Sequence, residues 1–146
     1  MDSKQQLVLA AMAAARGDAY TPVQLQKLLF LLNENLPEEN GGQQFNFQPY
    51  DYGPFDVDVY RVANQLAEND FVEVSRNERT DFRTYEATAK GVEAGDQIIS
   101  QMHPLVRDYL ILSSHWVRSL SFPDLLAAIY TAYPDMKVNS VFQDAR

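Results

Sequence analysis

The chain of 146 residues carries 46% apolar and 22% charged side chains, which fits one folded domain over residues 1–146 and excludes a disordered chain. It has no cysteine, which excludes disulfides, thiolate zinc sites and cysteine nucleophiles, and no apolar run of about 20 residues, so we expect a cytoplasmic protein without membrane contact. Its net charge of −8, from 12 basic and 20 acidic residues, disfavours DNA binding unless a local basic patch offsets it.

Two helices are expected in the first part of the chain. The alanine-rich segment from Ser3 to about Arg16 repeats small apolar residues at helical spacing, and Gly17 is a typical stop residue. A second helix is expected to start at Thr21, an N-cap candidate, with Pro22 in its first position. Its apolar stripe is wide, so we expect four of its leucines to be buried at the centre of the core: Leu25, Leu28, Leu29 and Leu32.

An aromatic segment and a third helix follow. Phe45 and Phe47 alternate with polar neighbours, which predicts a short strand between residues 43 and 52. The Tyr-Gly-Pro tripeptide at 52–54 is a turn signal. A helix is expected next, over residues 56–69, with acidic side chains at its positive N-terminal end.

A β-hairpin and three helices complete the expected elements. Apolar arms at 71–74 and 82–85 flank a polar tip, and helices are expected over 88–102, 104–119 and 121–133. In the fifth helix one face collects Leu105, Tyr109, Leu112 and Trp116. The residues of the sixth helix expected to face inward are Phe122, Leu125, Leu126, Ile129, Tyr130 and Tyr133.

This order predicts a mainly α fold with one small β-hairpin. Residues 1–88 follow the order of a winged-helix core, and residues 88–146 add extra C-terminal helices. In such a core the hairpin would be the wing, and the helix over 56–69 would be the nominal recognition helix.

Three segments of the first half resemble a known family. Residues 21–31 (TPVQLQKLLFL) are similar to the opening of the Panacea domain, also called the SocA-like antitoxin family. Residues 50–59 (YDYGPFDVDV) resemble its YxYGPxSxEV segment, with Asp56 where the family often has serine. Residues 66–72 resemble the family's passage from a short helix into a strand. The departure at Asp56 leaves a polar helix cap but carries over no specific serine role.

The later half is closer to the YwgA-like bacterial proteins, which it resembles at residues 120–122, 129–134 and 139–140. Residues 85–91 (YEATAKG) resemble the exit from the wing in winged-helix regulators, with Ala87 in place of the usual leucine. The resemblance to Panacea domains implies an antitoxin or regulatory adaptor that neutralises a toxin by direct contact. It implies neither an enzymatic activity nor a cofactor.

Two groups of side chains are candidates for partner contact. The aromatic cluster at residues 45–55 contains Tyr50 and Tyr52, which alternate around Asp51 and are expected to face the same way. Aromatic residues are enriched at interfaces, although core packing explains most of this cluster equally well.

The hairpin tip supplies the second group, Arg76, Arg79 and Arg83, with Glu78 and Asp81 between them. Three arginines on a wing suit a phosphate backbone, whereas a solvated loop is the simpler interpretation.

The sequence predicts no catalytic residue, metal or cofactor. His103 and His115 are twelve positions apart, which does not match the spacing of two metal ligands on one helix. Ser113 and Ser114 precede His115, but neighbouring residues of a helix do not face one another. Acidic residues surround the Tyr-Gly-Pro turn and could bind a hard cation, yet the helix start explains two of them without a metal: Asp51, Asp56 and Asp58.

We therefore expect a non-enzymatic protein-interaction module, an antitoxin or adaptor whose acidic surface suits a basic partner such as a toxin. The alternative is a winged-helix transcriptional regulator that binds DNA, and a homodimer is left open for either. The recognition-helix position is net acidic, with Arg61 as its only basic residue, and this disfavours the DNA-binding alternative.

Overall fold

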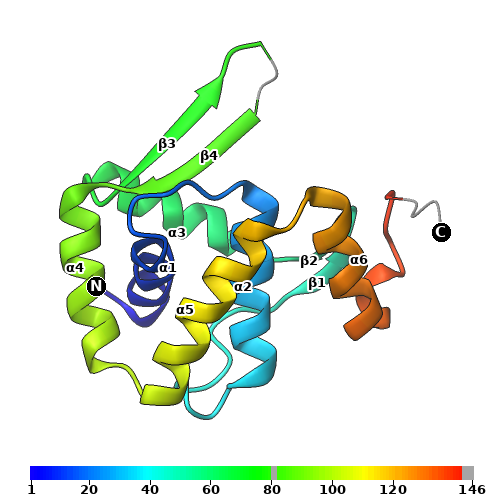
Figure 1. The fold of residues 1–146 in the computed structure, drawn as a ribbon, viewed down its shortest axis with the longest axis horizontal. Helices are drawn as coiled ribbons and strands as arrows, with labels where there is room; N and C mark the ends of the chain where they lie inside the picture. Colours follow the sequence, from blue (N-terminus) through cyan, green and yellow to red (C-terminus); the bar gives the residue numbers. More distant parts are fainter. Residues whose placement is uncertain (80–81, 143–146) are drawn as a thin grey trace.

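A computed structural model describes residues 1–79 and 82–142 of the chain (Figure 1). Within this part, six α-helices, a short 3-10 helix and two antiparallel two-stranded sheets are present. The mainly α fold expected from the sequence is confirmed, but there are two small sheets where one hairpin was predicted. None of the helices described is long and apolar enough to cross a bilayer.

The first two helices carry the start signals expected of them. Helix α1 (Ser3–Ala14) is capped by Asp2, and helix α2 (Pro22–Asn35) by Thr21. The Thr21 hydroxyl accepts from the backbone of Gln24, whose side chain accepts from the backbone N–H of Thr21, so each satisfies an N–H group that the helix leaves open. The four leucines predicted at the centre of the core are all fully buried: Leu25, Leu28, Leu29 and Leu32.

The small residues of α1 allow a second helix to approach closely. Residues 7–13 are buried on every side, and α4 (Ala89–Gln101) packs along them. A Cβ atom added at Gly95 of α4 would lie 2.2 Å from the Cβ of Ala13, so only glycine fits this crossing. In Figure 1, α1 lies at the middle of the helical body with α3, α4 and α5 around it.

The aromatic segment forms a hairpin that the sequence did not predict. Strand β1 (Gln48–Tyr50) pairs with β2 (Gly53–Phe55), and the Tyr-Gly-Pro turn begins the second strand. A short strand, β1, does lie within the predicted range 43–52, but Phe45 and Phe47, whose alternation suggested it, precede β1 in irregular chain and are buried against the core. Their alternation reflects packing of an extended segment rather than membership of a sheet.

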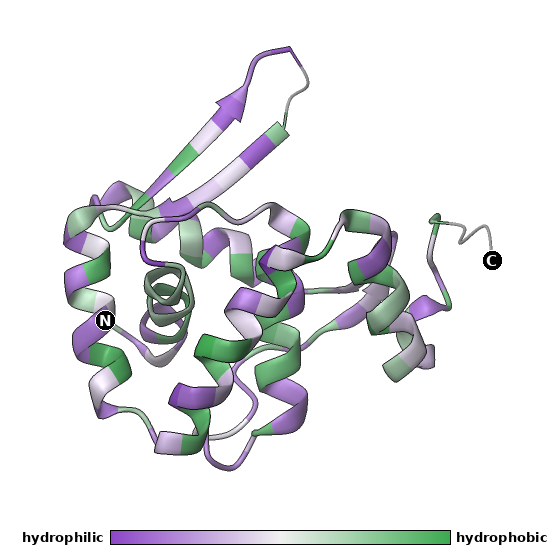
Figure 2. Ribbon diagram, viewed as in Figure 1, coloured by the Kyte–Doolittle hydropathy of each residue, from purple (hydrophilic) through white to green (hydrophobic). Residues whose placement is uncertain are grey.

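Helix α3 (Val57–Glu68) leads into the second hairpin, β3 (Val72–Asn77) paired with β4 (Phe82–Ala87). Figure 1 shows this hairpin projecting from the helical body, and Figure 2 colours the outer end of β3 hydrophilic. At its base Tyr20 forms a single antiparallel bridge with Tyr85, so the chain before α2 adds one residue to the edge of β4.

The last helices bury different faces from those predicted. Helix α5 (Pro104–Ser119) packs its other side on the core and leaves Leu105, Leu112 and Trp116 exposed. Both sides of α5 carry apolar residues at helical spacing, so periodicity alone did not distinguish them. In α6 (Phe122–Ala132) the predicted inward residues are buried except Phe122, which is 44% exposed, and Tyr133, which is half-buried. The residues that α5 does bury are Val106, Leu110, Ser113, Ser114 and Val117.

The chain after α6 crosses back over the first hairpin. A 3-10 helix, η1 (Pro134–Lys137), contacts β1 and β2, and the backbone N–H of Val141 donates to the carbonyl of Asp51 at 2.9 Å. The Phe142 ring then meets that of Phe122 edge-on, with centroids 5.8 Å apart. This final segment, residues 134–142, therefore holds the start of α6 against the turn at 51–53.

Candidate protein-binding groove

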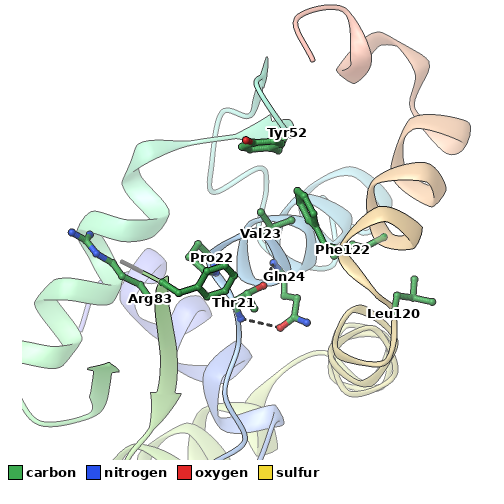
Figure 3. A pocket seen from close by; sticks show the side chains of 10 residues that line it. Thr21, Pro22, Val23, Gln24, Tyr52, Arg83, Leu120 and Phe122 are labelled. Atoms are coloured by element: carbon green, nitrogen blue, oxygen red, sulfur yellow. Dashed lines mark hydrogen bonds between the residues drawn. The ribbon is translucent and has the colours of Figure 1, made fainter. Parts of the chain in front are cut away.

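A groove of about 610 Å³ opens beside the β3–β4 hairpin. Its floor is the first turn of α2, one wall is the outer end of β4, and the opposite wall is the start of α6 (Figure 3). Most of its lining is apolar, and the side chains that line it are Thr21, Pro22, Val23, Gln24, Tyr52, Phe82, Arg83, Leu120, Phe122 and Leu125.

Three large aromatic side chains of this groove are exposed to solvent. Phe82 is 57% exposed, Tyr52 45% and Phe122 44%, and they come from three separate parts of the chain. Exposed apolar residues that converge on one concave surface are typical of binding sites, whereas singly scattered ones are not. The groove therefore offers a preformed apolar surface for another molecule.

Local structure holds each wall in place. Tyr52 is placed by the tight turn between β1 and β2, and its ring meets Phe122 edge-on with centroids 5.5 Å apart. Ser121 caps α6, which fixes Phe122 as the first residue of that helix. The floor is rigid because the reciprocal hydrogen bonds of Thr21 and Gln24 close the first turn of α2.

Among the described residues, Arg83 is the one charged residue that lines the groove. In Figure 3 its side chain extends from β4 to the side away from Phe122, so the guanidinium lies at the rim. Arg76 is its register partner on β3, which puts two arginines directly opposite each other on the hairpin.

The five residues predicted to contact a partner do not form one site. Tyr52 and Arg83 line the groove, and Arg76 lies opposite Arg83. Arg79 lies in the turn at the outer end of the hairpin, and Asp81 lies outside the described residues. Tyr50 is exposed, and its ring stacks on that of Phe55, whereas the ring of Tyr52 contacts Phe122. The two tyrosines therefore have different neighbours and do not form a pair.

The two acidic side chains at the start of α3 are held by an ion-pair network and a helix cap. Asp58 accepts from Arg61 at 2.9 Å and from Lys4 at 2.7 Å, and these two partners lower the pKa of Asp58 to about 2. Asp56 caps the helix and also accepts from the backbone N–H of Asn46. Asp56 and Asp58, two of the three carboxylates around the turn, thus have helix-cap and ion-pair roles. No group of three metal-binding side chains occurs in residues 1–79 and 82–142.

Two polar side chains of α2 form hydrogen bonds to the backbone of the segment before α3, a role that the sequence patterns did not predict. The Gln26 amide both donates to the carbonyl of Asp56 at 3.0 Å and accepts from its backbone N–H at 3.1 Å. The buried Lys27 ammonium donates to the carbonyl of Pro54 at 3.2 Å, and burial lowers the pKa of Lys27 to about 7. The signal in the sequence was a glutamine and a lysine inside an otherwise apolar stripe.

The serine–histidine sequence at 113–115 forms no nucleophile–base pair. The Ser114 hydroxyl is buried between the Tyr20 hydroxyl and the guanidinium of Arg118, whereas His115 is exposed. His103 caps α5 through its Nδ1 atom, which accepts from the backbone of Leu105 at 3.1 Å. His103 therefore has a helix-capping role, and His115 lies on the exposed side of α5.

Comparison of the chain with protein-family models and with curated proteins gives no match.

Proposed function

We propose that this chain is a protein-interaction module that binds a partner protein through the groove beside the β3–β4 hairpin. The observation that carries the proposal is the convergence of Tyr52, Phe82 and Phe122, three exposed aromatic side chains, on one apolar concave surface. Aromatic anchors in a preformed pocket account for a large share of binding energy at protein interfaces. An antitoxin or adaptor, the role implied by the resemblance to Panacea domains, would use such a surface to hold its partner.

A winged-helix DNA-binding regulator is the second candidate. The element order from α1 to β4 fits a winged-helix core, and the opposed pair Arg76 and Arg83 would suit a phosphate. The helix that would enter the major groove argues against it, because the one basic residue of that helix, Arg61, is already paired with Asp58. With a net charge of −8 the chain would also be repelled by DNA at long range.

Binding of a protein is tested by capture on the immobilised chain with two matched variants. Phe122→Ser removes an aromatic wall of the groove, and Trp116→Ser removes a similarly exposed aromatic residue of α5. The proposal expects one partner that wild type and Trp116→Ser retain and Phe122→Ser loses. A partner lost with Trp116→Ser alone would transfer the binding surface to α5 and refute the groove.

Binding of DNA is tested by titrating a random DNA duplex at several salt concentrations. The proposal expects binding weaker than about 100 μM at physiological salt, beyond the usual range for non-specific binders. Micromolar affinity with a steep salt slope that flattens in the Arg76→Ala/Arg79→Ala/Arg83→Ala variant would favour the regulator instead.

A further inference from the structure

The outer edge of β4 stops pairing where the groove begins. Tyr20 and Tyr85 exchange two backbone hydrogen bonds, of 2.8 and 2.9 Å, on this edge. In an antiparallel pair such doubly bonded positions recur every second residue. The next one would join Arg83 to residue 22, two positions back along β4 and two positions on from Tyr20.

Residue 22 cannot take that place. Pro22 has no backbone N–H to donate, and it is the first residue of α2, where the chain turns away from β4. Among the described residues no other backbone group replaces it on this edge, so the N–H and C=O of Arg83 face outward over the groove. The Pro22 ring, instead of pairing with β4, becomes part of the groove floor.

The outward N–H and C=O groups of Arg83 thus lie next to the apolar lining of the groove. An extended segment laid along β4 would take up the bridge that Tyr20 begins and would place every second side chain toward the groove. One large apolar side chain would lie between Pro22, Tyr52 and Phe122. A helix docked in the same groove would leave the Arg83 backbone groups unpaired beside an apolar ligand, which costs free energy.

The positive charge at the rim of the groove indicates which charged side chain the bound segment carries. Among the described residues, Arg83 is the one charged residue of the lining, and it places a positive charge at the rim of the groove. A carboxylate of the ligand would lie against this rim. A lysine or arginine there would be repelled.

We propose that the groove binds an extended segment of another protein as an added strand on β4, with one large apolar side chain in the groove and a carboxylate at the Arg83 rim. This inference rests on the proposed function and specifies the form in which the partner is held. The partner as a whole can be basic, as the acidic remainder of the surface suits, while the bound segment carries an acidic residue.

The test begins by selecting a random dodecapeptide library on the full chain, with counter-selection on Phe122→Ser. Enriched peptides are expected to share one large apolar residue with a nearby aspartate or glutamate. A synthetic peptide of that consensus is then methylated at one backbone nitrogen at a time, and its binding is measured by fluorescence anisotropy. Methylation is expected to weaken binding by about tenfold or more at the one position that donates to the Arg83 carbonyl, and to have little effect at the two positions beside it, because Tyr20 already occupies the bridge to Tyr85.

Two protein variants and one amide complete the test. Arg83→Gln is expected to weaken binding by about three- to tenfold and to reduce its salt dependence, as loss of one rim charge does. Trp116→Ser is expected to bind as wild type does. On binding, the amide proton of Arg83 is expected to become protected from hydrogen exchange.

A methylation scan without one sensitive position between two insensitive ones, or an Arg83 amide that stays unprotected, would overturn the added strand. Either result would overturn only the mode of docking and would leave the proposed function untouched. A library that yields no groove-dependent peptide also overturns the inference, while the capture experiment with Phe122→Ser and Trp116→Ser decides the proposed function by itself.

Discussion

The ammonium of Lys27 donates a hydrogen bond to the carbonyl oxygen of Pro54 across 3.2 Å in the protein interior. This contact joins α2 to the first residues of β2, next to the turn that carries Tyr52 into the groove. Because Gln26 binds the backbone of Asp56 two residues further on, adjacent residues of α2 fix the whole passage from β2 into α3.

Replacing Lys27 by Met should change how stability depends on pH. Burial lowers the pKa of Lys27 to about 7 in the folded chain, against an ordinary value of 10.5, so between these values the unfolded chain binds more protons. The free energy of unfolding should therefore rise with pH from 7 to 9, with a slope approaching about 1.4 kcal/mol per pH unit. Urea unfolding at several pH values should show this rise in wild type and lose it in Lys27→Met.

Lys90→Met is the matched control, because Lys90 also donates to a backbone carbonyl, that of Asn69, but is exposed. It should keep the slope of wild type. An equal slope in Lys27→Met and wild type would mean that Lys27 keeps an ordinary pKa and is not enclosed as described.

Substitution of Gly53 should destabilise the turn for two reasons. Its φ of +92° is unfavourable for other residues, and an added Cβ would lie 3.2 Å from the Tyr130 ring. We expect Gly53→Ala to cost about 1–3 kcal/mol and Gly53→Val more, measured by thermal or urea unfolding. Gly17→Ala separates the two causes, since Gly17 has φ +97° but open space around it. A cost no larger at Gly53 than at Gly17 would show that the contact with Tyr130 does not matter.

The centre of the core is tested by Leu28→Ala. Leu28 is fully buried within α2, so its truncation should cost about 2–5 kcal/mol through lost burial and the cavity left behind. The exposed Leu112 of α5 is the control, and Leu112→Ala should leave the melting temperature nearly unchanged. Similar melts for both variants would contradict the burial that distinguishes them.

Sequence patterns predicted the parts of this fold that local chemistry determines. Thr21 and Pro22 mark the start of α2 because a capping hydroxyl and a proline satisfy the same open helix end, whatever lies nearby. The positive φ of Gly53 likewise follows from a turn that glycine suits. The gathering of apolar residues in α2 identified the core because that helix is buried nearly all round.

Features that depend on distant packing were not predictable in this way. In α5, Leu112 and Leu110 are equally apolar, and the packing of α5 on α1 and α2 decides that Leu110 is buried and Leu112 is not. Phe122 was expected inside, but its position at the first turn of α6 places it at the edge of the groove. The groove itself joins β4, α2 and α6, so no single stretch of sequence carries its signature.

The central claim is that the groove contacts a partner protein, and the most direct measurement is site-specific photo-crosslinking in cells that naturally contain the chain. A benzoylphenylalanine in place of Phe122 is compared with one in place of Trp116, which is similarly exposed on α5. The account predicts a crosslink to one discrete protein from position 122, through a short segment identified by mass spectrometry, and none from position 116. Crosslinking from position 116 alone, or from position 122 to nucleic acid, would contradict it.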